Sequence, residues 1–250
     1  MIRIKTEKEL VHIRAACSVV AKVLSSLKGE IKPGITTREL DAFAEKQIVT
    51  LGALPAFKGY RGYKHATCLS VNEEVVHGIP GNKVLKDGDI IGVDAGAIVA
   101  GFYGDAAITF PVGKIDKKTE KLLRATKKAL SLAIRQARAG KYLGDVSAAI
   151  EQHALKFGYR VVRDLYGHGI GSDLHEDPLI PNFGKAGQGP QLKKGMVLAI
   201  EPMFNLGGYK IETLKDGWTV VTADRSLSAH FEHTILITDG DPEILTEIKD

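Results

Sequence analysis

Two acidic residues interrupt an apolar stretch, Ile90 to Phe110, that reads as a β-hairpin. The stretch is rich in Ile, Val, Phe and Tyr and predicts two strands joined by a turn at Ala100-Gly101. A two-residue turn there puts Asp105 diagonally across the hairpin from Asp94, and the period of two along a strand points both carboxylates to one face. Two buried carboxylates repel each other unless they are protonated or neutralised by cations. This face is therefore predicted to hold a shared ligand.

The same pattern returns further along the chain. The ten residues that end at Asp94 align with the ten that end at Glu201, 107 positions later, with matching Leu, Lys, Gly and most apolar positions. The next acid on a similar strand, Glu232, corresponds to Asp105 at an offset of 127 positions. Residues 34–52 also repeat, at an offset of 106. A repeat of this kind indicates a duplicated half.

The duplication predicts an α+β fold with two pseudo-symmetric halves. We expect a single domain over residues 1–250, made of halves that span about 1–113 and 114–250. Each half brings a hairpin with one inward acid on each strand, so four carboxylates converge near the pseudo-twofold axis. Oxygen-rich clusters of this kind bind divalent cations, and bridging carboxylates hold two of them.

Composition narrows the class of protein and its compartment. The net charge of +4 is too small to imply a nucleic-acid partner by itself. Cys17 and Cys68 stand alone without a CxxC pair, which favours a reducing, cytoplasmic setting. The charged N-terminus argues against a signal peptide, and the absence of a run of about 18 apolar residues argues against a membrane span. A monomer is the default expectation.

The sequence also predicts helices before and after the first hairpin. Thr6 and Glu9 form a predicted capping box at the start of the first helix, and Thr37 is predicted to cap the second. A long basic amphipathic helix is predicted over Lys114 to Gly140. Its Lys and Arg residues are usually a solvated face, but they leave open transient docking to a polyanion such as ribosomal RNA.

Histidines in glycine-rich loops complete the candidate site. His77 and His168 each precede a Gly-Ile pair, where an imidazole can approach a ligand closely, although such histidines are often structural. Four carboxylates with one neutral histidine suit Mn, Fe(II), Co or Zn better than a thiolate site would.

Seven short motifs add to this pattern: Val76-His77-Gly-Ile-Pro80, Val93-Asp94-Ala-Gly96, Gly104-Asp105, Gly167-His168-Gly-Ile-Gly171, Leu174-His175-Glu-Asp-Pro178, Ile200-Glu201-Pro202 and Ser228-Ala-His-Phe-Glu232-His-Thr234. Together they resemble the pita-bread metallopeptidases, and among these the type I methionine aminopeptidases, along nearly the whole chain. Glu232 follows Glu201 by only 31 positions, without the long insertion typical of type II enzymes. The resemblance implies the pita-bread fold, an antiparallel sheet covered by helices, in one catalytic domain.

The resemblance also implies a ligand set for two divalent metal ions, with Co, Mn, Fe(II) and Zn as candidates. Asp94 would chelate one ion, His168 and Glu201 would hold the other, and Asp105 and Glu232 would bridge both. A hydroxide activated by the two metals would attack the carbonyl of the first residue. The free amino terminus would bind the metal on the Asp94 side, which explains exopeptidase action.

Catalytic and substrate-binding roles follow from the same resemblance. Glu201 would accept the proton, His175 would stabilise the oxyanion, and His77 would contact the scissile amide. The substrates would be nascent polypeptides and peptides that begin with Met, preferably before a small second residue. The methionine pocket would be lined by Phe57, Tyr60, Tyr63, Cys68, Leu174, Met203 and Trp218.

Two positions depart from the family pattern, and two other functions remain open. His230 stands where the family often has Gln, and Phe57 stands where some relatives have Cys. The first alternative is a prolidase or Xaa-Pro aminopeptidase of the same fold, which usually carries an extra N-terminal domain. The second is a binding module of this fold without catalysis, but such proteins typically lose metal ligands, and all five are present here.

Overall fold

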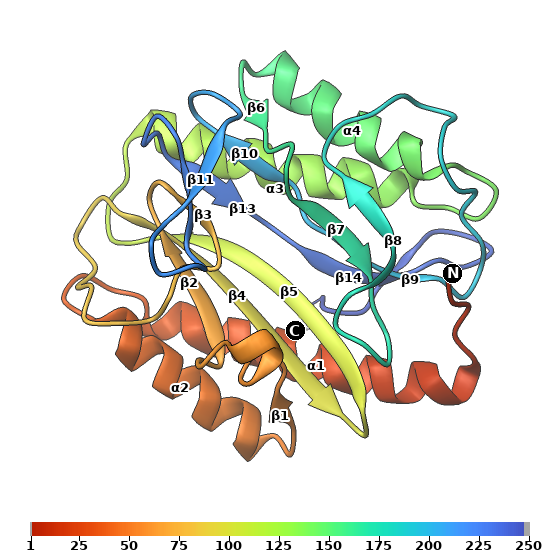
Figure 1. Ribbon diagram of the computed structural model, residues 1–250, viewed down its shortest axis with the longest axis horizontal. Helices are drawn as coiled ribbons and strands as arrows, with labels where there is room; N and C mark the ends of the chain where they lie inside the picture. The colour runs from red at the N-terminus through yellow and green to blue at the C-terminus, as the bar shows by residue number, and fades with distance from the viewer. Residues whose placement is uncertain (1, 248–250) are drawn as a thin grey trace.

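Two pairs of helices enclose antiparallel sheets in the computed structural model, which describes residues 2–247 (Figure 1). In the view of Figure 1, α1 (Glu7–Glu30) and α2 (Thr37–Thr50) lie along the bottom, and α3 (Lys117–Gln136) and α4 (Leu143–Lys156) lie along the top. The fold is α+β, as the sequence predicts. Met1 and residues 248–250, the ends of the predicted domain, lie outside the described residues.

The strands form a four-stranded, a five-stranded and two three-stranded sheets in the described residues. The first contains β1 (Leu54–Pro55), β2 (Thr67–Val71), β4 (Ile90–Val99) and β5 (Phe102–Pro111). The five-stranded sheet contains β7 (Tyr166–Gly169), β8 (Glu176–Pro181), β9 (Val197–Ile200), β14 (His233–Leu236) and β15 (Glu243–Ile244). The others are β6 (Arg160–Val161) with β10 (Met203–Asn205) and β13 (Ser228–His230), and β3 (Glu74–Val76) with β11 (Ile211–Thr213) and β12 (Val220–Thr222).

The β4–β5 hairpin runs across the middle of the molecule and has the predicted turn (Figure 1). Ala100 and Gly101 both have positive φ, 49° and 80°, as a two-residue hairpin turn with the right twist requires. Asp105 lies opposite Gly96 in the register, two residues from Asp94. The diagonal placement of the two acids is therefore confirmed.

The structure repeats where the sequence does. α2 and α4 both contain 14 residues, and their first residues are 106 positions apart. Each is preceded by an isolated bridge to a distant segment, Thr36 to Val84 and Tyr142 to Gln191, which again differ by 106 and 107 positions. The halves are thus alike in these helices and bridges. The prediction of a hairpin in each half is wrong for the second half, because β10 to β13 separate β9 from β14, and Glu201 and Glu232 lie just outside those two strands.

Capping boxes begin the first two helices. Thr6 and Glu9 make the predicted reciprocal bonds. The prediction for the second helix is wrong by one residue, because Thr36 and not Thr37 is the N-cap. Glu39 stands three residues after Thr36, so its carboxylate accepts from the Thr36 N–H at 2.8 Å while its own N–H donates to the Thr36 hydroxyl at 3.2 Å.

The basic helix is shorter than predicted. Asp116 accepts a hydrogen bond from the Thr119 N–H and begins α3 at Lys117, and the helix ends at Gln136 rather than Gly140. Its exposed side carries seven cations, of which one pairs with an acid on the same helix (Arg124 with Glu120, 3.6 Å). The seven are Lys117, Lys118, Lys121, Arg124, Lys127, Lys128 and Arg135.

Helix α1 packs against β4 and β5 at very short range. At Gly104 the two backbones are so close that a Cβ atom would lie 2.5 Å from the Cys17 nitrogen. By length and composition α1 could cross a membrane, which the sequence analysis did not expect, but 56% of its most apolar window is buried inside the protein. In the fold it therefore serves as a core helix.

The close approach at Gly104 generates a stability prediction. Gly104→Ala should lower the free energy of unfolding by about 3 kcal/mol, because the added methyl meets backbone atoms that cannot rotate away. Gly29→Ala is the matched control, since nothing lies within 4 Å of its Cβ position and it lies inside α1. That control should stabilise by up to about 1 kcal/mol. Urea unfolding measures both, and a Gly104→Ala protein as stable as wild type would contradict the packing.

Candidate metal centre and its pocket

The metal-binding candidates of the first half lie on the central hairpin. Asp94 is on β4 and Asp105 on β5, and both line one cavity of about 310 Å³. Cys68 on β2 lies directly opposite Asp94 in the register, so the next strand places an apolar wall beside the first acid. The hairpin thus delivers acids and pocket wall together.

The second half supplies the other candidates from a different sheet. His168 is on β7 opposite Ala199, and Glu201 follows the last residue of β9. Glu232 lies between β13 and β14, and its N–H donates to the Ala107 carbonyl on β5 at 2.8 Å. That bond brings Glu232 against the hairpin of the first half.

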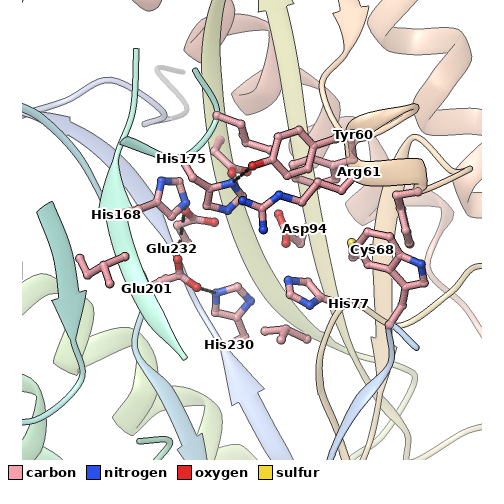
Figure 2. A pocket seen from close by; sticks show the side chains of 17 residues that line it. Tyr60, Arg61, Cys68, His77, Asp94, His168, His175, Glu201, His230 and Glu232 are labelled. Carbon is pink, nitrogen blue, oxygen red and sulfur yellow. Dashed lines mark hydrogen bonds and ion pairs between the residues drawn. The ribbon is translucent and has the colours of Figure 1, made fainter. Parts of the chain in front are cut away.

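The five predicted ligands all line this cavity, and Figure 2 shows four of them, Asp94, His168, Glu201 and Glu232. One ligand atom from each of Asp105, His168 and Glu232 lies within 4.8 Å of the others, as a shared metal ion requires. The His168 Nδ1 atom bonds to the Gly169 carbonyl at 2.9 Å. This bond fixes the hydrogen on Nδ1 and leaves Nε2, which is 3.7 Å from the Glu201 carboxylate, free as a ligand.

The acids carry unsatisfied charge. Burial raises the pKa of Asp94 and of Glu201 to about 7. Burial, reinforced by the neighbouring acids, raises the pKa of Asp105 and of Glu232 as well. Carboxylates lose most of their favourable hydration when buried together, so a bound cation is what makes four ionised acids tolerable here.

Orphaned atoms identify where cations fit. In the part of the chain that the structure describes, Asp94 Oδ1, Asp105 Oδ1 and Glu232 Oε1 are buried without a hydrogen-bond partner. Buried polar atoms without partners are uncommon in proteins and mark an ion-binding or functional site. Carboxylate oxygens with one imidazole nitrogen form a donor set for hard or borderline divalent ions. The residues present therefore fit a divalent metal centre.

Three further side chains face the metal centre. Tyr60 is hydrogen-bonded to His175 Nδ1 at 2.8 Å, and the His175 ring lies tilted by 51° against His168 with centroids 4.2 Å apart. Burial, with help from nearby His168, lowers the pKa of His175 to about 3, and burial lowers that of His77 to about 4. Both imidazoles are thus neutral at neutral pH and can donate hydrogen bonds.

The predicted methionine pocket is largely assembled. The cavity wall opposite His168 carries Cys68 (Figure 2), and the Tyr63 and Trp218 rings pack edge to face 4.9 Å apart. Six of the seven predicted pocket residues line the cavity: Phe57, Tyr60, Tyr63, Cys68, Leu174 and Trp218.

Met203 differs from the prediction. It is not among the described residues that line the cavity and is fully buried behind it, in a cluster with Val76, Val162 and Val220. Met203 pairs with His230, so the two side chains share one face of the sheet, and His230 lines the cavity. Val76, which belongs to the same buried cluster as Met203, lines the cavity in its place.

The cavity also contains residues to which the sequence assigned no role. His230 lies 3.4 Å from the Glu201 carboxylate, without hydrogen-bond geometry, at the position where the family often has Gln. Arg61 stacks over Tyr60 at 5.3 Å with a left-handed φ of 48°. Val76 and Leu179 complete the wall. The Gly59-Tyr-Arg-Gly62 sequence was the available signal for Arg61, since it implies a tight turn.

Comparisons with known proteins agree with this geometry. The profile of metallopeptidase family M24 matches residues 11–239. A methionine aminopeptidase of Clostridium perfringens is 51% identical over the whole of both chains. The crystal structure of a methionine aminopeptidase from Thermotoga maritima superposes with a TM-score of 0.98 at 49% identity, and covers 99% of this chain and 100% of that one.

The prolidase alternative is more distant. The prolidase from Pyrococcus furiosus superposes with a TM-score of 0.81 at 25% identity. The match covers 99% of this chain but 66% of that one. The two share the pita-bread fold, and this chain shares about twice as many residues with the aminopeptidases.

The crowded acids generate a second prediction. In metal-free protein at pH 8, Asp105→Asn should raise the melting temperature by about 2–4 °C, because a neutral amide removes about 1 kcal/mol of the cost of burying an acid among three others. With excess Co(II) the order should invert, since wild type gains more from binding. Thermal unfolding by circular dichroism measures both.

Glu120→Gln is the control for this experiment. Glu120 is an acid on the exposed side of α3, and its replacement should leave both melting temperatures nearly unchanged. An Asp105→Asn protein that is less stable without metal, yet gains as much as wild type with metal, would contradict a cation-dependent acid cluster.

Proposed function

The chain belongs to metallopeptidase family M24, and we propose that it uses this cavity to remove the N-terminal methionine from new proteins and peptides. The curated methionine aminopeptidases to which it is similar are about half identical over their full length. The carrying observation is one cavity that joins four buried acids and His168 to an apolar, aromatic wall. Such a cavity places a hydrolytic centre beside a slot for one apolar side chain.

Five residues would hold two divalent cations, with Co, Mn, Fe(II) and Zn as candidates: Asp94, Asp105, His168, Glu201 and Glu232. When bound, such a pair lowers the pKa of a shared water and polarises a substrate carbonyl. Asp105 and Glu232 come from different halves and meet at the centre, which supports their role as the bridging ligands.

The chain's own groups would handle protons and orientation. Glu201 would accept the proton released from water, since its carboxylate lies within 4 Å of both His168 and His230. His175 would donate a hydrogen bond to the developing oxyanion from Nε2, because Tyr60 occupies Nδ1. His77 would contact the scissile amide from its position beside Trp218.

The pocket would take the methionine side chain. Cys68 and the Tyr63–Trp218 pair provide soft, polarizable surfaces that suit a thioether. Phe57 narrows one wall, as its ring lies against Gly96, where a Cβ would be 2.7 Å away. A small second residue would be preferred, since His77, His175 and His230 also line the cavity and take up room beside the pocket.

Organisation and partners complete the proposal. One catalytic domain of two halves, about 1–113 and 114–250, would work as a monomer in the cytoplasm. The seven exposed cations of α3 support transient docking to ribosomal RNA, where substrates emerge.

Peptide hydrolysis is the direct test. Metal-free protein supplied in turn with Mn, Fe(II), Co and Zn should release methionine from Met-Ala-Ser and much less from Met-Lys-Ser. Asp94→Asn should reduce the rate by about 100-fold or more, since a lost ligand costs at least as much as a lost outer partner. Glu120→Gln should behave as wild type. Protein that binds two cations but cleaves only an Xaa-Pro peptide would move the assignment to the prolidase class.

Ribosome docking has its own test. Wild-type protein should co-sediment with ribosomes at low salt and dissociate as salt rises, because the contacts are to phosphates. Lys121→Glu with Lys128→Glu reverses two charges on α3 and should abolish pelleting while peptide hydrolysis is retained. Lys8→Glu with Lys46→Glu is the charge-matched control on α1 and α2 and should still pellet. Equal loss in both variants would leave no role for α3.

A further inference from the structure

A buried cation outside the cavity ties the start of the chain to the catalytic loop. Lys5 is 7% exposed, and its Nζ forms an ion pair with Glu176, whose side chain is 6% exposed. The Lys5 N–H also donates to the Gly195 carbonyl at 2.8 Å, which fixes the arm that precedes α1. A buried ion pair needs further hydrogen bonds to offset its desolvation, so the surroundings of Glu176 indicate its purpose.

Glu176 organises the turn that precedes it. Its Oε1 accepts hydrogen bonds from the Ser172 N–H at 2.9 Å and from the Asp173 N–H at 3.4 Å. The Gly171 N–H donates to the Asp173 carbonyl at 3.1 Å within the same turn. One carboxylate thus fixes the backbone between the metal ligand His168 and the substrate-facing His175.

The glycines of this motif make room for the ion pair. A Cβ on Gly171 would lie 2.4 Å from Lys5 Cε and 2.7 Å from Glu176 Oε1. A Cβ on Gly169 would lie 2.1 Å from the Asp177 carbonyl oxygen on β8. The Gly-Ile-Gly sequence after His168 is therefore explained by how closely the loop packs against β8 and the N-terminal arm.

We propose that Lys5, through Glu176, is a positioning residue for His175. His175 directly precedes Glu176, which pairs with Gly169 on β7. Tyr60 holds the His175 ring from one side, and the turn fixed by Glu176 holds its backbone from the other. The role assigned to His175 rests on the proposed function, whereas the clamp itself rests on the contacts alone.

The test removes the pair without leaving a lone buried charge. Lys5→Met with Glu176→Leu should lower kcat for Met-Ala-Ser by about 10-fold to 100-fold, as a small displacement of a catalytic group does. KM and the binding of two Co(II) ions should stay at wild-type values. In a His175→Ala background the same double change should have almost no further effect on kcat, because both act through one group.

Hydrogen exchange gives a readout that does not need activity. In metal-free protein the double variant should exchange the Ser172 and Asp173 amides at least about 10-fold faster, since their acceptor is gone. Glu176→Gln, which keeps the shape of the side chain, should produce smaller changes in the same directions. If the double variant does not fold, Glu176→Gln still tests the proposal by the same measurements.

Arg14→Met with Glu243→Leu is the matched control. That pair joins α1 to β15 at 2.7 Å, far from the loop in sequence, and its removal should change neither kcat nor exchange at Ser172. Unchanged exchange, or a fall in kcat of equal size in the His175→Ala background, would overturn the proposal. A wild-type protein without aminopeptidase activity would instead contradict the proposed function. Hydrogen exchange would still show whether the Lys5–Glu176 pair orders the loop.

Discussion

Three hydrogen bonds between the halves fix the separation of the two central acids. The Glu232 N–H donates to Ala107 at 2.8 Å, the Thr234 hydroxyl donates to the Asp105 carbonyl at 2.7 Å, and the Thr109 hydroxyl donates to the His230 carbonyl at 2.7 Å. Asp105 and Glu232 repel each other when both are ionised, so the backbone and not the acids must keep them together. Every ligand distance that spans the two halves depends on this junction.

Packing around the junction, above all by α1, stabilises these contacts between the two halves. α1 packs on the hairpin at Gly104, one residue before Asp105, and buries Cys17 completely. The buried hydroxyl of Thr234 also bonds with the Asp105 N–H at 3.3 Å. A site of unpartnered acids costs stability, and proteins tolerate such sites when the packing around them leaves no room to relax.

Much of the fold and of the candidate site could be predicted from the sequence, for physical reasons that can be named. The hairpin and its diagonal acids follow from a turn and a period of two along each strand. The repeat identifies Glu201 as the residue of the second half that corresponds to Asp94. The contact between the two halves could not be predicted, because no local sequence pattern indicates that Thr109 bonds to His230, 121 positions away. Met203 was misplaced for the same reason, since its place in the cavity wall is taken by Val76, a residue 127 positions away in the chain.

The residues proposed as metal ligands and the two histidines proposed to contact the substrate are held in place in different ways. Asp94, Asp105 and His168 lie within strands, where ladder hydrogen bonds to a neighbouring strand hold the backbone. His77 and His175 lie in loops, and loops move more easily than strands. Precision at a loop histidine therefore requires contacts from elsewhere in the chain. The buried Lys5–Glu176 pair meets that requirement at His175, and the seating of Gly78 against the Leu69 backbone, where a Cβ would be 2.3 Å from an oxygen, meets it at His77.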